Sequence, residues 1–345
     1  MGLNAGTSYD ATMYFYNLPS NKLELWMSLE SDRFLNPVLR EFYKEKDVVM
    51  EERRLRVESS PYGKLFEEFL ATAFQAHPYG EPLVGHMSDV QSFTRQDAES
   101  YFREHYTPNN LIVGIVGDVK PQEVIKLAET YWGRIPRGPQ PKPLVTIEPD
   151  QMGERKVEVE DKAQPFVVIG YHKPSATHPD DAVFDAITDY LGGGNYMGIS
   201  RSSRLHKSLV KEKKIAVAAL AIPGLPGSKY PNLLTFLAVS SKDHTNQECE
   251  DAIYEEIEKL KTELITPEDL KAIKTRTRAN FIRQLESNQG LAMQLTFYQA
   301  VQGDWRDLFK QLDKINQVTA EEIKRVANEY LQKKNRTVAE LVTIQ

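Results

Sequence analysis

Two acidic residues on one predicted helix are the first candidates for chemistry. Apolar residues at helical spacing predict a helix over residues 38–56, and Glu45 and Glu52 lie about two turns apart on its apolar stripe. A carboxylate on a buried face is costly unless it is paired, hydrogen-bonded or bound to a metal. Both acids are therefore candidates for a metal ligand or an acid–base group, but spacing alone favours neutralisation by Arg53, Arg56 or Lys46.

The histidines and the cysteine limit this chemistry further. None of the seven histidines has a second histidine four positions later, so no helix presents two imidazoles one turn apart. Cys249 is the only cysteine, which excludes an intrachain disulfide and a cysteine-based zinc site, and its acidic surroundings are expected to raise its pKa. We expect His77 to make a loop hydrogen bond and His172 to be structural or exposed.

Other catalytic motifs are rejected on spacing. The glycine-rich residues 192–198 have the glycine separation of a P-loop, but Ile199 and Ser200 follow where Lys and Ser or Thr are required. A flexible or helix-capping loop is expected there. The chain also lacks a Gly-x-Ser-x-Gly nucleophile elbow.

Composition excludes several partners. The 345 residues include 43 Lys and Arg against 49 Asp and Glu, a net charge of −6, which gives no electrostatic footprint for nucleic acid. No apolar run approaches the roughly 18 residues of a membrane span, and the first residues do not resemble a signal peptide. We therefore expect no nucleic acid, no membrane span and, for the sequence as it stands, a cytoplasmic location.

The elements that must position these groups form an α+β pattern. Strands are predicted over residues 12–18, 111–116, 155–159, 166–171, 215–222, 233–240 and 337–344. Helices are predicted over residues 22–33, 38–56, 94–105, 118–132 and 180–191, with three more after Thr245.

One series of elements occurs twice. Thr94 and Asp97 open a helix that turns into the strand 111–116, and Thr319 and Glu322 open a helix that leads to the closing strand. The repeat predicts two copies of one α+β unit, the first lacking its beginning, and chance similarity is the alternative.

The Pro-rich segment between the copies is the expected domain boundary. We predict a first unit over residues 1–136, a linker over 137–154 and a second unit over 155–345.

Four blocks of the sequence resemble the pitrilysin/insulinase zinc metallopeptidases, a family that includes mitochondrial processing peptidase. The blocks are Asn4-Ala5-Gly6-Thr7-Ser8, Glu45-Lys46-Asp47-Val48-Val49-Met50-Glu51-Glu52, His77-Pro78-Tyr79-Gly80 and Tyr106-x-Pro108-Asn109-Asn110. The resemblance implies two homologous units, each an antiparallel sheet backed by helices, facing each other across a peptide-binding chamber.

The resemblance also implies site residues. In the family, Zn2+ is held by the two His of an inverted His-x-x-Glu-His motif and by a downstream Glu, and the motif's own Glu activates the zinc-bound water. The matching block makes Glu52 the third zinc ligand and Glu45 a supporting acid. Asn4, Ala5 and Gly6 resemble the edge strand that pairs with the substrate backbone.

Two departures from the family pattern change the expected role of this chain. The His-x-x-Glu-His motif is absent, and in the family it lies farther upstream of the third ligand than the 51 residues before Glu52 allow. The family's substrate-gripping Arg and Tyr are replaced by Val210 and Val217. This pattern resembles the zinc-bearing subunit of two-subunit members, lacking its first strands and zinc helix, so we expect Zn2+ in the complete protein but not bound by this chain.

Three hypotheses follow for the function. The first is a subunit or fragment of a zinc metalloendopeptidase that cleaves peptides or unfolded polypeptide, inactive alone and completed by a homologous partner subunit bearing the Arg and Tyr. The second is a non-catalytic scaffold or regulatory subunit, and the third is a binding module that uses the edge strand. A periplasmic or other exported compartment is expected for the complete protein, and residues 1–135 are expected to be less stable or to self-associate.

Overall fold

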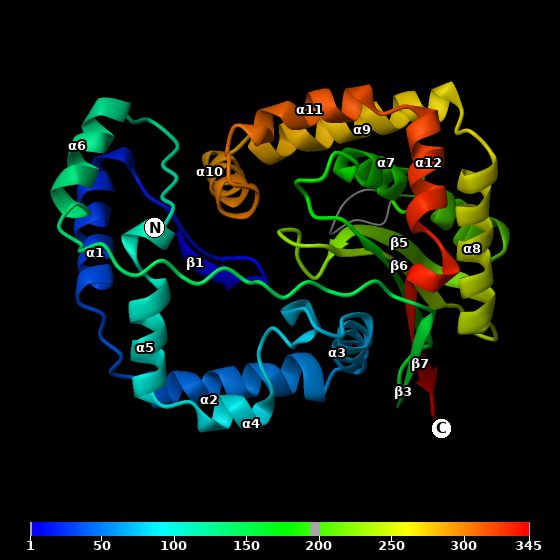
Figure 1. Cartoon of the computed structure of the whole chain (residues 1–345), viewed down its shortest axis with the longest axis horizontal. Coiled ribbons are helices and arrows are strands. Elements are labelled where there is room, and N and C mark those ends of the chain that lie inside the picture. Colours follow the sequence, from blue (N-terminus) through cyan, green and yellow to red (C-terminus); the bar gives the residue numbers. More distant parts are fainter. Residues whose placement is uncertain (1, 194–200, 345) are drawn as a thin grey trace. The chain divides into compact units, whose positions relative to one another are not determined.

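The computed structural model of the chain describes residues 2–193 and 201–344 and divides it into two compact units (Figure 1). The first unit comprises Met1–Arg53, Val84–Val145 and Gln284–Leu308, and the second comprises Arg54–Leu83, Thr146–Arg283 and Phe309–Gln345. Each unit therefore takes one segment from the other half of the sequence. The predicted boundaries near residues 136 and 155 separate two homologous copies in the sequence, whereas the compact units each combine segments from both copies. The predicted boundaries therefore stay a prediction.

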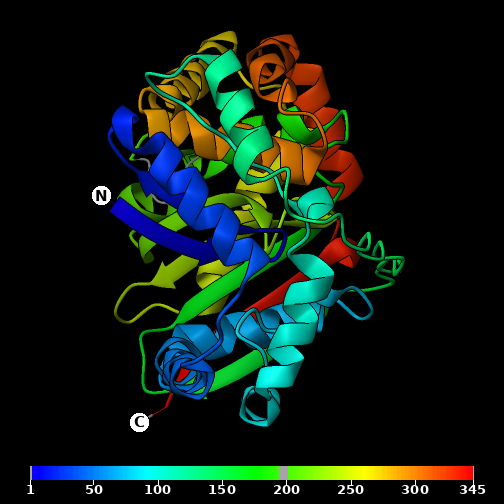
Figure 2. The same ribbon diagram turned by 90° about the vertical axis from the view of Figure 1, so that its left-hand side faces the viewer.

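The first unit is built around the hairpin β1 (Gly2–Thr7) and β2 (Thr12–Asn17), which pair antiparallel. Tyr16 of β2 packs edge-on against Trp26 of α1, with ring centroids 5.8 Å apart. In Figure 2 the chain is darkest blue at its N-terminal strand and the helix that follows the hairpin. The helices of this unit are α1 (Leu23–Leu35), α2 (Phe42–Arg53), α4 (Met87–Ser92), α5 (Arg95–His105), α6 (Pro121–Tyr131) and α10 (Asn288–Phe297).

The predicted strand at residues 111–116 is absent from the described structure. The segment follows the short 3-10 turn η4 (Pro108–Asn110) but belongs to neither sheet. A strand exists only where a neighbour supplies ladder hydrogen bonds, and no strand pairing within the described residues involves this segment. The residues of this segment favour a strand, but the predicted strand is wrong for the described structure.

The second unit contains a five-stranded sheet in the order β3-β7-β4-β6-β5. Its strands are β3 (Arg155–Asp161), β4 (Phe166–Lys173), β5 (Ala216–Leu225), β6 (Asn232–Ser240) and β7 (Arg336–Thr343). All neighbouring pairs are antiparallel except β3 and β7, which run parallel. The expected α+β class is confirmed.

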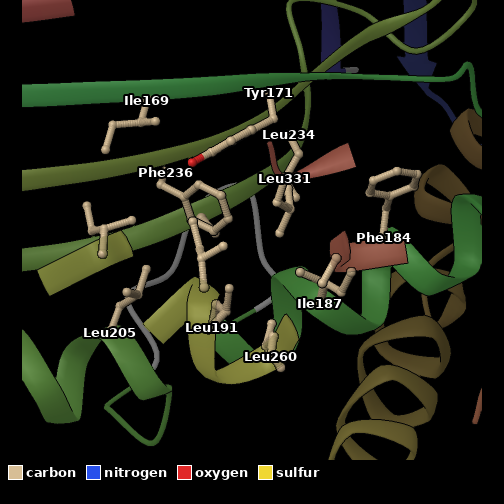
Figure 3. Close-up of a cluster of buried hydrophobic side chains, with 14 of the residues drawn as sticks. Ile169, Tyr171, Phe184, Ile187, Leu191, Leu205, Leu234, Phe236, Leu260 and Leu331 are labelled. Atoms are coloured by element: carbon tan, nitrogen blue, oxygen red, sulfur yellow. The ribbon is translucent and has the colours of Figure 1, made fainter. Parts of the chain in front are cut away.

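Helices cover both faces of this sheet. Because side chains alternate along a strand, Ile169 and Tyr171 of β4 point into the main core, drawn in Figure 3, whereas Gly170 faces Phe69 of α3 (Pro61–Ala73). The core side is covered by α7 (Asp181–Leu191), α8 (Asn246–Thr262) and α12 (Ala320–Tyr330). The helix α3, which belongs to the first half of the sequence, thus buries the other face of the second sheet.

The region after Thr245 holds five α-helices rather than the three predicted, because short turns divide it. The two not yet named are α9 (Pro267–Leu285) and α11 (Asp307–Gln317). Short 3-10 helices are η1 (Ser20–Lys22), η3 (Pro78–Gly80) and η7 (Lys333–Asn335). Short π-helices are η2 (Arg54–Glu58), η5 (His206–Glu212) and η6 (Tyr298–Gln302).

The glycine segment caps a helix where it is described. Gly192 ends α7, and Gly193, at φ +101°, donates its amide to Thr188 O at 3.0 Å, which satisfies a carbonyl at the helix end. The remainder of the predicted glycine loop, residues 194–198, lies outside the described residues.

An acidic row lies along α7. Asp189 accepts hydrogen bonds from Arg276 at 2.6 and 2.9 Å, and one turn earlier Asp185 accepts one from Gln311 Nε2 at 3.1 Å. Burial and the neighbouring Asp181 raise the pKa of Asp185 to about 7. The folded unit therefore favours the protonated form of this carboxyl group.

The segment that joins the two halves of the sequence is fastened to the second unit by one carboxylate. Glu148 accepts hydrogen bonds from three successive backbone amides, those of Gln75 at 2.8 Å, Ala76 at 2.9 Å and His77 at 3.0 Å. Arg155 Nη1 lies 3.9 Å from the same carboxylate. Burial alone would raise the pKa of Glu148, but the amide bonds outweigh it and hold the pKa below its ordinary value.

Candidate functional site

The predicted peptide-binding residues lie on β1, a fully exposed terminal strand. Ser8 N–H donates to Ala11 O at 2.9 Å at the turn of the hairpin. Hydrogen-bonded and non-bonded pairs alternate in an antiparallel ladder, so from this bond the backbone groups of Asn4 and Gly6 face β2. Those of Ala5 face away from it, toward the outer edge.

Two contacts agree with this parity. The hydroxyl oxygens of Thr7 and Thr12 lie 3.3 Å apart, as expected for the closer side chains of a non-hydrogen-bonded pair. The outward amide of Ala5 donates to the side-chain Oδ1 of Asn4 at 2.8 Å. The sequence analysis did not single out Leu3 and Thr7, which share the outward orientation; counting parity from the turn would have found them.

The outer edge of β1 carries none of the features that usually protect an edge strand. Proline, bulges and charges keep exposed edges from pairing with other chains. At one edge of the five-stranded sheet, β5 has one register shift at Val217 and another between Ile222 and Leu225, where Pro223 also lies. At the other end, β3 carries five charged residues in seven. By contrast, β1 reads Gly-Leu-Asn-Ala-Gly-Thr.

Gly6 leaves one face of β1 open next to this edge. A Cβ at Gly6 would meet no atom within 4 Å, so no neighbour in the described structure fills the space beside this residue. An incoming backbone could therefore approach β1 closely at this point.

The burial predicted for the two acidic residues is wrong. Glu45 lies exposed in the first turn of α2, and Glu52 is half-buried near its end. The apolar stripe that would bury them is itself open, with Val48 exposed at 55% and Leu55 at 64%. The spacing of this stripe is typical of a helix face that packs in a core. In the described structure, however, α4 is the main neighbour of α2 and covers only part of the stripe.

The described residues do not form a zinc site. Glu52 was the predicted third ligand, yet no group of three or more His, Cys, Asp or Glu side chains within residues 2–193 and 201–344 is arranged to hold a metal ion. A catalytic zinc needs three protein ligands around one point. Glu52 as a ligand and Glu45 as a supporting acid therefore stay predictions, and the residues present do not fit the metal.

The two valines that are expected to replace the family's Arg and Tyr lie in the second unit. Val210, in η5, packs half-buried against the main core. Val217 is 53% exposed at the irregularity of β5 between Ala216 and Ala218. Bulges re-aim side chains and occur next to functional sites. A valine there presents only methyl groups, which cannot hydrogen-bond a substrate carbonyl.

The remaining candidate side chains have structural roles. His77 Nδ1 accepts the amide of Tyr79 at 3.1 Å, which confirms the expected loop hydrogen bond. His172 Nε2 lies 3.1 Å from Ala73 O, and burial lowers the pKa of His172. Cys249 is buried, and burial more than the nearby Glu248 raises its pKa, as the sequence predicted in direction.

Comparison with known proteins identifies the class of fold. Residues 1–86 match the model of insulinase (peptidase family M16), and residues 92–277 match that of the peptidase M16 inactive domain. A crystal structure of a protease from Helicobacter pylori superposes with a TM-score of 0.91 at 31% identity, covering 99% of this chain and 82% of that one. A peptidase M16 inactive domain from Pseudomonas fluorescens shares the fold, with a TM-score of 0.84 at 15% identity over 100% of this chain and 81% of that one.

Curated relatives agree. The chain is 32% identical over 334 residues to the zinc protease PqqE of Helicobacter pylori, covering 95% of this chain and 73% of that protein. It is 23% identical to a probable mitochondrial-processing peptidase subunit beta of Arabidopsis thaliana, over 99% of this chain and 65% of that protein. The chain belongs to the insulinase family, peptidase family M16. Among the described helices, none is long and apolar enough to cross a membrane.

Proposed function

We propose that this chain is the peptide-holding part of a zinc metalloendopeptidase of the M16 family, and that it binds extended polypeptide as a strand added to β1. The observation that carries the proposal is the open outer edge of β1, which is exposed along its whole length and lacks charge, proline and bulge. Family membership adds the chemical class of the substrate, since the relatives are named proteases.

Strand addition explains how such a site would tolerate many sequences. The added strand would exchange main-chain hydrogen bonds with the outward groups of Leu3, Ala5 and Thr7, and these bonds do not depend on side-chain identity. Asn4 Oδ1 now accepts the Ala5 amide, so a peptide carbonyl would take over that bond. Each such exchange contributes only about 0.5–1.5 kcal/mol, which predicts weak binding by the strand alone.

Hydrolysis is assigned to the complete peptidase rather than to this chain by itself. Of the predicted zinc ligands the sequence carries Glu52, while no histidine pair has the required spacing. We therefore propose that Zn2+ serves the complete protein, in which it would polarise the scissile carbonyl and activate water. This chain's part would be to hold the peptide backbone in register.

The test is peptide binding by the chain and by a proline variant. Ala5→Pro removes one outward N–H and leaves the groups of Asn4 and Gly6 that face β2, while Ala5→Val keeps the N–H and is the matched control. We expect binding of a fluorescent unfolded peptide to persist with a chelator present, to weaken about two- to tenfold in Ala5→Pro and to survive in Ala5→Val. Equal binding by the two variants would refute the assignment to β1.

The partners and the compartment are part of the same proposal. A homologous subunit would supply the Arg and Tyr that Val210 and Val217 replace, because valine cannot bind a carbonyl or an oxyanion. An exported location is proposed for the complete protein; one structural neighbour is described as the periplasmic protease PqqL of Escherichia coli.

A second candidate is a non-catalytic scaffold or regulatory subunit. It is favoured by the match of residues 92–277 to the inactive domain of the family. A stable complex with an Arg- and Tyr-bearing homologue that alters that homologue's activity in metal-free buffer, with no peptide binding at β1, would favour this alternative.

A further inference from the structure

A groove with a basic wall lies between α9 and α11, the two helices that Figure 1 draws side by side. Residues 267–283 of α9 and 309–317 of α11 belong to the second unit. The helices touch where Lys274 Nζ donates to Asn316 O at 2.7 Å. The groove at this contact, here called the basic groove, has a volume of about 350 Å³, and the described residues that line it include three cations and no acid.

The three cations, Lys271, Lys274 and Arg278, form one stripe along α9. Their spacing of three and then four residues places them on the same face of the helix, over about 10 Å of its length. Ile273, on another face of α9, is fully buried in the main core. Lys271 and Arg278 are exposed, so the stripe presents its charge to solvent.

The exposed cations of this stripe lack the acidic partners that lysines of the preceding helix have. On α8, Lys259 and Lys261 each pair with the glutamate three positions earlier, at 2.7 and 2.6 Å. Within residues 2–193 and 201–344, by contrast, Lys271 and Arg278 form no ion pair. Glu268 stands three positions before Lys271, yet these two side chains are not paired. The positive charge of the stripe is therefore available to a ligand.

The middle cation of the stripe, Lys274, is held in position by α11. Asn316 O is one of the carbonyls that a helix leaves unpaired in its last turn, and Lys274 satisfies it. An ammonium group has three N–H donors, and this bond uses one of them. Lys274 thus reaches across the groove with donors left for a ligand, and less side-chain entropy is lost when one binds.

We propose that the basic groove binds an acidic segment of a separate polypeptide, whose carboxylates pair with Lys271, Lys274 and Arg278. Charge complementarity determines this choice of occupant, because three positive charges within about 10 Å attract a run of negative charges and repel a basic one. The site shares no residue with β1, which belongs to the first unit, and it does not depend on the proposed function.

The rest of the lining indicates what else the segment carries. Pro267 and Leu270 precede the stripe in α9 and add apolar atoms to the groove. An apolar residue next to the acidic run would cover these two side chains while the carboxylates reach the stripe. An extended chain spans about 10 Å in three residues, so a run of about five acidic residues is long enough to meet all three cations.

The charge of the whole chain favours a short segment over a broad anionic surface. Acidic residues outnumber basic ones by 49 to 43, so a nucleic acid or an anionic membrane that contacted a wide face would meet repulsion outside the groove. A volume of about 350 Å³ is near the lower end for ligand sites, which hold roughly 300–1,000 Å³. A few acidic side chains fit such a space.

The test is binding of a fluorescent peptide of one leucine and five glutamates to the full chain, measured by anisotropy. We expect saturable binding at about 50 mM salt that weakens about three- to tenfold at 500 mM salt, and no binding of the matching glutamine peptide. Lys271→Glu and Arg278→Glu should each weaken binding about three- to tenfold, because each change removes one attraction and adds one repulsion. Lys274 is kept, since its loss would also disturb the end of α11.

Lys242→Glu is the matched control, because Lys242 is exposed before α8 and does not line the groove. It makes the same change of charge and should alter binding by less than about twofold, as should Ala5→Pro in β1. No binding of the glutamate peptide, or equal weakening by Lys242→Glu, would overturn the proposal. Binding of anionic lipid vesicles, or a dimer of the chain, that is lost in Lys271→Glu and Arg278→Glu while the peptide does not bind would overturn it in favour of that other occupant.

Discussion

The carboxylate of Glu148 offers a sharp test of how the connecting segment is held. Its side chain is 7% exposed, with one oxygen accepting the amide of Gln75 and the other accepting those of Ala76 and His77. In Glu148→Gln the amide oxygen can serve two of these donors, but the NH2 group then faces the third. A buried donor without an acceptor costs about 1–3 kcal/mol, and the other two bonds lose their charge assistance.

We therefore expect Glu148→Gln to lower the free energy of unfolding by about 2–3 kcal/mol at neutral pH and the melting temperature of the second unit by roughly 5–10 °C. The pKa of Glu148 is depressed in the folded state, so its contribution is complete above the unfolded pKa of about 4.3 and is lost as the pH falls through the folded pKa. The difference between wild type and variant should accordingly shrink in acid.

Urea unfolding at pH 7 and about pH 3.5 measures both effects. Glu160→Gln, which removes an exposed carboxylate from β3, is the matched control and should change stability by less than about 0.5 kcal/mol. An effect of Glu148→Gln no larger than that of the control, or one equally large at both pH values, would refute the role of the three amides.

Three further outcomes are expected. Gly170→Ala should lower the free energy of unfolding by about 1–3 kcal/mol, because the new Cβ would lie 2.5 Å from Phe69 Cζ. Phe69→Ala should lower it by about 3–5 kcal/mol. Urea unfolding of the double variant should show a loss smaller than the sum of the two, and additive losses would count against this contact. Asp185→Asn should raise the free energy of unfolding at pH 8 by about 1–2 kcal/mol and have no such effect near pH 4. The pKa of Asp185 is raised in the folded state, so this carboxyl group destabilises the fold as the pH rises through that pKa. A difference between wild type and variant that does not change with pH would contradict this explanation. Backbone amide hydrogen exchange should be faster in residues 84–135 than in residues 155–191. Equal protection of the two ranges would contradict the expected lower stability of the first unit.

Local sequence patterns predicted most of the elements. The capping box at Thr94, the apolar run of β4 and the aromatic strand β2 all depend on neighbours within a few residues, so the sequence was sufficient to place them. The segment 111–116 failed for the opposite reason. Its residues favour a strand, but strand formation requires a partner that is distant in sequence, and no sheet of the described structure includes it.

The candidate site divides in the same way. The open edge strand with Asn4, Ala5 and Gly6 could be predicted, because its residues match a family block and form a local hairpin. The burial of Glu45 and Glu52 could not, since the periodicity of a helix defines a face but not what covers it.

The family, the α+β class and the edge strand could be read from the sequence alone, because motifs and short-range periodicity are written directly in the order of residues. Three features could be seen only in the folded chain: α3 covers one face of the second sheet, α10 lies beside β2, and the apolar stripe of α2 is open. Those facts depend on long-range packing, in which apolar faces find whichever partner the rest of the chain brings to them.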